Sequence, residues 1–92
     1  LRQAQACFRA KRYEQGLALL EDANPSPTVN YWTARFLERL DRIDEAVALY
    51  TAIETNDEAS ELHAVAKRDR EFAEWRRDFR KKAGLETKQE VK

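Results

Sequence analysis

The sequence predicts an all-α protein made of two antiparallel helical hairpins, a fragment of an α-solenoid, followed by a long C-terminal capping helix. Three observations predict this fold class. In residues 34–53 the apolar side chains recur at the i, i+3, i+4, i+7 spacing of a helix with one buried face. Residues 4–23 repeat this scheme in weaker form. The chain of 92 residues also contains only two glycines and two prolines.

The first hairpin is expected over about residues 1–24, with helices at 1–10 and 13–23 and a turn at Arg12. Gly16 lies inside the second helix, where a glycine costs about 1 kcal/mol in helix propensity relative to alanine. Two helices can approach closely only where one of them lacks bulk. We therefore expect a tight contact between helices at Gly16.

The second hairpin is expected over about residues 27–55, with helices at 27–40 and 44–55. Ser26 is suited to cap the first of these helices, and Pro27 fits the first helical position because an N–H there has no helical partner. No glycine or proline marks the joint between the two helices. A break is predicted there because, in one straight helix, the apolar residues before and after the joint would point in different directions, and no single neighbouring surface could bury both sets.

The C-terminal capping helix is expected over about residues 57–83. Thr55 and Glu58 have the spacing of a capping box at its start, and Gly84 stands where a helix would end. At 1.5 Å per residue this helix would be roughly 40 Å long. We therefore expect its first half to cap the hairpins and its aromatic second half to overhang. A hairpin broken near residues 68–70 is the alternative.

Sliding residues 1–23 onto 31–53, an offset of 30, aligns five identical pairs. These pairs are Ala4 and Ala34, Arg9 and Arg39, Arg12 and Arg42, Ala18 and Ala48, and Leu19 and Leu49. The segment LDRIDEAVALY, with Ala34 upstream, resembles the tetratricopeptide repeat, and AKRYEQGLALLEDA looks like a second, degenerate copy. The resemblance covers roughly residues 1–58. It departs from the family in its offset, which is 34 in the family, and in the turn glycines, which are replaced by Lys11 and Asp41.

In tetratricopeptide arrays the first helix of each pair lines a concave surface that holds extended peptides or partner helices, and the resemblance implies such a surface here. The residues it assigns to this surface are Gln5, Phe8, Arg9, Tyr31, Arg35 and Glu38. The family's clamp for a C-terminal carboxylate does not transfer, because Leu1, Gln5 and Trp32 stand where its lysines and asparagines would be. Trp32 is expected either at the binding surface or in the seam between the repeats.

A second candidate surface lies on the C-terminal helix, where Phe72, Trp75 and Phe79 share one helical face. Arg76 and Arg80 are the basic residues assigned to this surface. Burying an aromatic side chain is worth roughly 1.5–3 kcal/mol, so leaving three of them in water is unfavourable. A partner helix, a second copy of the chain or a further repeat would cover them.

Composition argues against several function classes. The formal net charge is zero, so bulk electrostatics predict neither a nucleic acid nor a membrane surface as partner. No apolar run approaches the ~20 residues of a membrane span. Cys7 and His63 are the only cysteine and histidine, so no catalytic pair, metal site or cofactor is predicted. The single cysteine favours a reducing compartment, and we expect a soluble protein that is cytoplasmic rather than periplasmic or secreted.

The sequence therefore predicts a protein–protein interaction adaptor or scaffold that binds a partner peptide or helix and is not an enzyme. One alternative is a structural segment of a larger enzyme, because residues 31–35 and the leucine-rich turn after them faintly resemble the superhelical domain of soluble lytic transglycosylases. Another is a basic–aromatic helix that binds RNA or an anionic membrane. Residues 84–92 are expected to form a polar flexible tail. The absence of methionine indicates a segment of a longer protein.

Overall fold

A computed structural model describes the backbone of residues 1–91 and the side chains of residues 1–83. The described chain is all-α, without a strand, and its last element is a long helix. The elements are α1 (Arg2–Arg9), α2 (Tyr13–Glu21), α3 (Pro27–Arg39), α4 (Ile43–Glu54), the short 3₁₀ helix η1 (Asp57–Ala59) and α5 (Ser60–Val91). The predicted fold class is confirmed.

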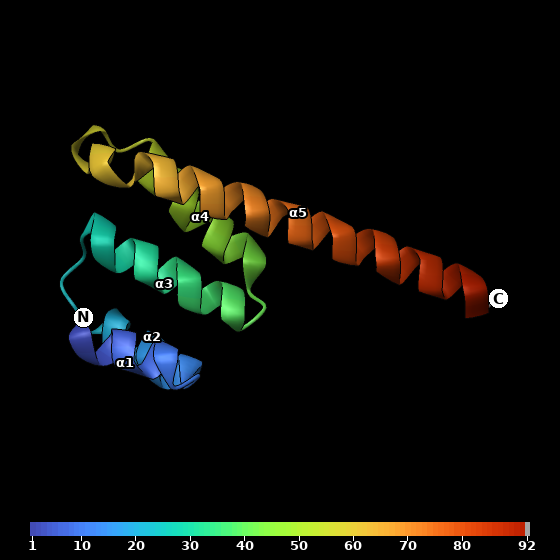
Figure 1. Ribbon diagram of the computed structural model, residues 1–92, viewed down its shortest axis with the longest axis horizontal. Coiled ribbons are helices and arrows are strands. Elements are labelled where there is room, and N and C mark those ends of the chain that lie inside the picture. Colours follow the sequence, from blue (N-terminus) through green and yellow to red (C-terminus); the bar gives the residue numbers. More distant parts are fainter. Residues whose placement is uncertain (92) are drawn as a thin grey trace.

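The helices pack in chain order, each against the next (Figure 1). α1 and α2 form one hairpin, α3 and α4 form the second, and α2 packs on α3 to hold the hairpins side by side. α5 lies along α4 and also touches α3, and its C-terminal part projects beyond the other helices. The molecule is consequently elongated, with extents of 50 × 29 × 17 Å.

Both hairpin turns are built in the same way. α1 is followed by Lys11 in the left-handed conformation (φ 61°), and α3 is followed by Asp41 in the same conformation (φ 66°). In the first turn the Lys11 N–H donates to the Phe8 carbonyl (3.1 Å) and the Arg12 N–H to the Cys7 carbonyl (2.8 Å). The same two bonds, with the same lengths, recur around Asp41. These bonds satisfy the last carbonyls of a helix and reverse the chain without a glycine.

The expected close contact at Gly16 is present. A Cβ atom at this position would collide with the Phe36 ring and would lie 3.1 Å from Cys7 Cβ. Phe36 is completely buried and meets the rings of Phe8 and Tyr13 edge to face. The missing side chain of Gly16 therefore leaves the space in which α3 packs against the first hairpin.

One predicted helix cap is confirmed and the other is wrong. The Ser26 side chain accepts a hydrogen bond from a backbone N–H in the first turn of α3 (3.1 Å), and Pro27 occupies the first helical position. At the start of the last element, however, Thr55 donates its hydroxyl back to carbonyls of α4. The Asn56 side chain instead accepts from the Glu58 N–H (3.0 Å) and caps η1. The cap lies one residue later because the Thr55 hydroxyl already has partners in the preceding turn.

α5 is one continuous helix of 32 residues, about 48 Å long at 1.5 Å per residue. The alternative of a hairpin broken near residues 68–70 is wrong, and so is the end predicted at Gly84, since the helix continues to Val91. A single glycine lowers helix propensity by about 1 kcal/mol, which does not stop a helix that its neighbours propagate. The predicted tail over residues 84–92 is therefore helical as far as Val91, and its side chains lie outside the described residues.

The second half of α5 projects past the hairpins, as predicted (Figure 1). The helix packs mainly on α4 and buries Ala66 and Ala73 completely. Arg77 still reaches Asp44 at the start of α4 (2.8 Å), and Arg80 pairs with a carboxylate of the turn before α4. Long arginine side chains of the projecting half therefore still tie α5 to the start of α4 and to the turn before it.

We predict that Lys11→Gly raises the free energy of unfolding by about 0.5–1 kcal/mol, because a left-handed residue that carries a Cβ is strained. Asp41→Gly should give a smaller gain, since it also removes the ion pair with Arg80. Urea unfolding followed by circular dichroism measures both. A Lys11→Gly variant less stable than the wild type would contradict the assignment of strain to this turn.

Gly16→Ala should lower the free energy of unfolding by about 1–3 kcal/mol, because the added methyl group collides with the buried Phe36 ring. Helix propensity alone predicts the opposite, a gain of about 1 kcal/mol. Gln15→Ala, at the exposed neighbouring position, is the control and should change stability by less than about 0.5 kcal/mol. A rise in the melting temperature of Gly16→Ala would show that the helices are not in tight contact there.

Candidate functional site

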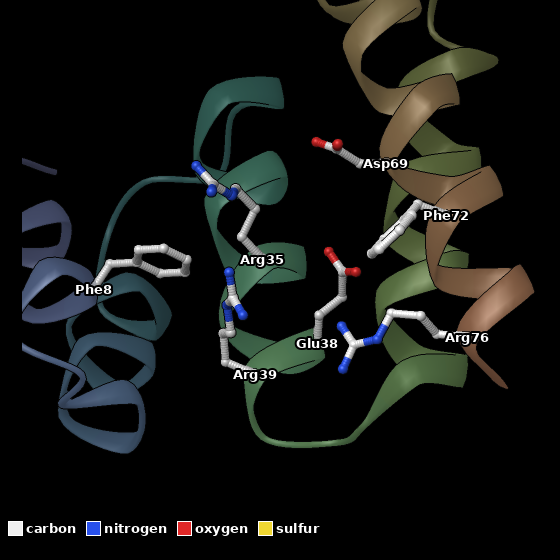
Figure 2. A pocket seen from close by; sticks show the side chains of 7 residues that line it. All are labelled: Phe8, Arg35, Glu38, Arg39, Asp69, Phe72 and Arg76. Carbon is white, nitrogen blue, oxygen red and sulfur yellow. The ribbon is translucent and has the colours of Figure 1, made fainter. Parts of the chain in front are cut away.

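A cleft of about 200 Å³ lies where α1, α3 and α5 face one another (Figure 2). We call it the concave cleft. Three lining residues, Phe8, Arg35 and Glu38, belong to the surface predicted on the first and third helices. Two more, Phe72 and Arg76, belong to the surface predicted on the C-terminal helix. The structure therefore brings the two predicted surfaces together. The complete lining is Phe8, Arg35, Glu38, Arg39, Asp69, Phe72 and Arg76.

The side chains of the cleft converge from different helices. Figure 2 shows Glu38, Phe72 and Arg76 pointing toward one another across the space between α3 and α5. Phe8 reaches from α1 toward α3. α2 and α4 contribute no residue to the lining, so the cleft belongs to the first helix of each hairpin and to α5.

The three arginines of the cleft lie near aromatic rings. Arg35 Cζ is 4.5 Å from the centre of the Phe8 ring and 4.9 Å from that of Trp32. Arg39 Cζ is 5.6 Å from the Phe8 ring centre, and Arg76 Cζ is 5.9 Å from a phenylalanine ring of its own helix. Among the described side chains none of these arginines forms a salt bridge. Cation–π contacts orient the guanidinium groups without neutralising their charge.

The two carboxylates of the cleft are each held by a tyrosine. The buried Tyr50 donates its hydroxyl to Glu38, and Tyr31 donates to Asp69 Oδ2 at 2.6 Å. Burial raises the pKa of the Glu38 carboxyl above its ordinary 4.5, although the Tyr50 hydrogen bond acts in the opposite direction. Burial, reinforced by the bond to Asp69, raises the pKa of Tyr31 to about 12. Both carboxylates are therefore already engaged within the fold.

Several residues predicted for the concave surface do not line the cleft, or make contacts that serve the fold. Gln5 is half-buried and Arg9 is exposed, and neither lines the cleft. Tyr31 ties α3 to α5 through its hydroxyl. Trp32 packs against the core and meets the rings of Phe8 (5.7 Å) and Tyr31 (6.1 Å) edge to face, so its predicted place in the seam is confirmed.

Two residues of the cleft were not predicted from the sequence. Arg39 lies one turn after Arg35 on the same face of α3, a spacing that could have identified it. Asp69 interrupts the apolar pattern of α5, and such an interruption indicates a polar role. Its partner Tyr31 is 38 positions away in sequence, so only the fold could reveal the pair.

Phe72, Trp75 and Phe79 form an exposed row on α5, which we call the aromatic stripe. Their exposed fractions are 56%, 59% and 59%. The rings stack along the helix, with centres 5.9 Å and then 5.5 Å apart. Arg80, which the sequence predicts for this surface, pairs with Asp41 and helps to fix α5 to the hairpins.

Cys7 and His63, the cysteine and the histidine of the chain, both contact other parts of the fold. Cys7 is half-buried beside the Gly16 contact, and His63 Nε2 lies 2.7 Å from the Asn56 carbonyl oxygen. In the described part of the chain no group of histidine, cysteine and acidic residues could hold a metal ion. Likewise, no helix among the described residues is long and apolar enough to cross a membrane.

Protein-family models, curated proteins and solved structures that were compared with this chain give no match. The tetratricopeptide resemblance therefore stays a prediction. Because unrelated helical hairpins share this packing and folds host many functions, the function must be argued from the cleft and the stripe themselves.

Glu38→Gln should flatten the dependence of stability on pH. The pKa of Glu38 is higher in the folded chain than in the unfolded chain, so the folded chain binds this proton more tightly. That contribution to stability is present at low pH and is lost as pH rises through the folded pKa. The wild type should therefore lose stability relative to Glu38→Gln as pH rises from the ordinary pKa of 4.5 through the raised pKa of the folded chain. Urea unfolding at each pH measures this.

Asp22→Asn, at an exposed position, is the matched control and should leave the pH slope of the wild type almost unchanged. A wild type that gains stability over Glu38→Gln as pH rises would contradict a raised pKa for Glu38.

Proposed function

We propose that this domain is a protein–protein interaction module whose concave cleft and aromatic stripe bind a helix of a partner protein, without chemistry of its own. The observation that carries the proposal is the continuity of the two features. Phe72 lines the cleft and is also the first ring of the stripe. A ligand that lies along α5 therefore contacts both.

The composition of the surface supports a protein partner. Aromatic residues and arginine are enriched at the energetic centres of protein interfaces, and exposed aromatic area without a cover is unusual in a monomer. Phe72, Trp75 and Phe79 follow the three-and-four spacing with which one helix packs along another. From Phe72 to Phe79 the stripe is roughly 10 Å long, about two turns of a partner helix.

Other ligand classes suit this surface less well. The cleft of about 200 Å³ is smaller than the roughly 300–1,000 Å³ of small-molecule sites. A nucleic acid would lay its phosphates along the stripe, where Glu71, Glu74 and Asp78 stand among the basic residues of α5. A partner helix with both apolar and acidic side chains can cover the aromatic rings and pair with the arginines of this surface.

A display library of amphipathic helices, selected on the immobilised domain, tests the proposal. The selected helices should bind at least about tenfold more weakly to Phe72→Ser and to Arg35→Glu, since each variant removes a contact at the centre of the surface. Isothermal titration calorimetry with synthetic copies of the selected helices gives the dissociation constants.

Leu19→Ser is the matched control, because Leu19 is an exposed apolar residue on α2, away from the cleft. Its affinity for the selected helices should stay within about twofold of the wild type. Helices that bind equally well to both cleft variants would overturn the proposal. Displacement of the helices by a single-stranded RNA would do so as well.

A further inference from the structure

The aromatic stripe occupies the core positions of a short heptad pattern. With Phe72 as the first core position, Trp75 and Phe79 fall on the next two, three and four residues later. The positions that flank such a core are then Glu71 and Asp78 on one side and Arg76 on the other. Over residues 71–79 the stripe thus has an acidic flank and a basic flank, and Asp69 stands one heptad before Arg76 on the basic side.

α5 cannot rotate to bury the stripe within its own fold. The opposite face of the helix is fixed to α4 by the completely buried Ala73 and by two ion pairs. Arg70 Nε lies 2.5 Å from Glu54, and Arg77 lies 2.8 Å from Asp44. The cover of the stripe must therefore come from outside this part of the chain.

The charges select the direction of a helix that packs on the stripe. In a parallel pair of identical helices the acidic flank of each helix faces the basic flank of the other. In an antiparallel pair the two acidic flanks face each other, and so do the two basic flanks. On this side of the stripe the cleft lining also contains Arg35 and Arg39 of α3, together with the carboxylates of Glu38 and Asp69. Those carboxylates accept hydrogen bonds from tyrosines, and none of the three arginines of the cleft forms a salt bridge among the described side chains.

We infer that the helix bound by the concave cleft and the aromatic stripe is α5 of a second copy, packed in parallel so that the two aromatic stripes meet. This inference rests on the proposed function and names its partner. Glu71 of each copy then faces Arg76 of the other, as flanking residues do in parallel coiled coils. Asp78 of each copy lies further along the same flank.

The area that the stripe offers fits a reversible dimer. An aromatic side chain buries roughly 150–250 Å² when fully covered. With more than half of each ring exposed, the three rings offer roughly 300–400 Å² per copy. A standard interface buries about 800 Å² per partner, so the flanks and the α3 edge of the cleft must supply the rest. An interface no larger than this standard size is expected to form and dissociate with concentration.

Sedimentation-velocity centrifugation of the domain over a wide range of concentrations tests the inference. The wild type should move from monomer to dimer as concentration rises, and Trp75→Ala should weaken dimerisation at least about tenfold. Leu19→Ala, which removes a comparable exposed apolar side chain from α2, should dimerise as the wild type does. Circular dichroism checks that each variant is folded.

Charge exchange tests the parallel direction. Glu71→Lys and Arg76→Glu should each weaken the homodimer, because each gives two flanks of the same sign. An equimolar mixture of the two variants should form a heterodimer, and the doubly substituted chain should dimerise about as well as the wild type. A double variant that is no better than the single ones would overturn the parallel arrangement.

The outcomes separate this inference from the proposed function. A domain that stays monomeric at every concentration but still binds selected helices at Phe72 and Arg35 refutes self-association and keeps the interaction module. A domain that neither dimerises nor binds any selected helix refutes both. Dimerisation that is insensitive to Trp75→Ala also refutes the inference, because the stripe would then lie outside the interface.

Discussion

The contact between Gly16 and Phe36 is the constraint on which the rest of the structure depends. Because a side chain is missing at Gly16, the Phe36 ring can enter the first hairpin and set the distance between α2 and α3. That distance brings Phe8 within reach of Arg35, and so creates one wall of the cleft. The core packing and the candidate binding surface therefore both depend on the missing side chain at Gly16.

The second wall of the cleft is formed by α5, and polar contacts mainly fix the position of this helix. Ion pairs along α4 and the hydrogen bond between Tyr31 and Asp69 fix the rotation of α5, while alanines keep the two helices close. Such ion pairs contribute little stability when they are exposed. They nevertheless favour one rotation of α5 about its axis over others, because the small alanines on its packing face would by themselves permit several. The same rotation that buries Ala66 and Ala73 leaves the aromatic residues facing outward.

The sequence was sufficient for the helices and for most of the cleft, because both depend on local spacing. Periodicity and the short-range pattern at Ser26 and Pro27 identified α3 and its start. The errors arose where residue type alone does not decide, either because a helix propagates past a glycine or because a tertiary contact intervenes. Gly84 has the residue type of a helix end but lies within α5, and Asp69 joined the cleft through a partner distant in sequence. The ion pair between Arg80 and the turn before α4 could likewise be found only from the fold.

The carboxyl group of Glu38 gives the cleft a property beyond shape and charge. It lies beside Tyr50 in surroundings that already favour its neutral form. An acidic side chain arriving from a partner would favour that form further, so association would be accompanied by proton uptake. If the inferred dimer forms, reciprocity requires that acidification strengthen it.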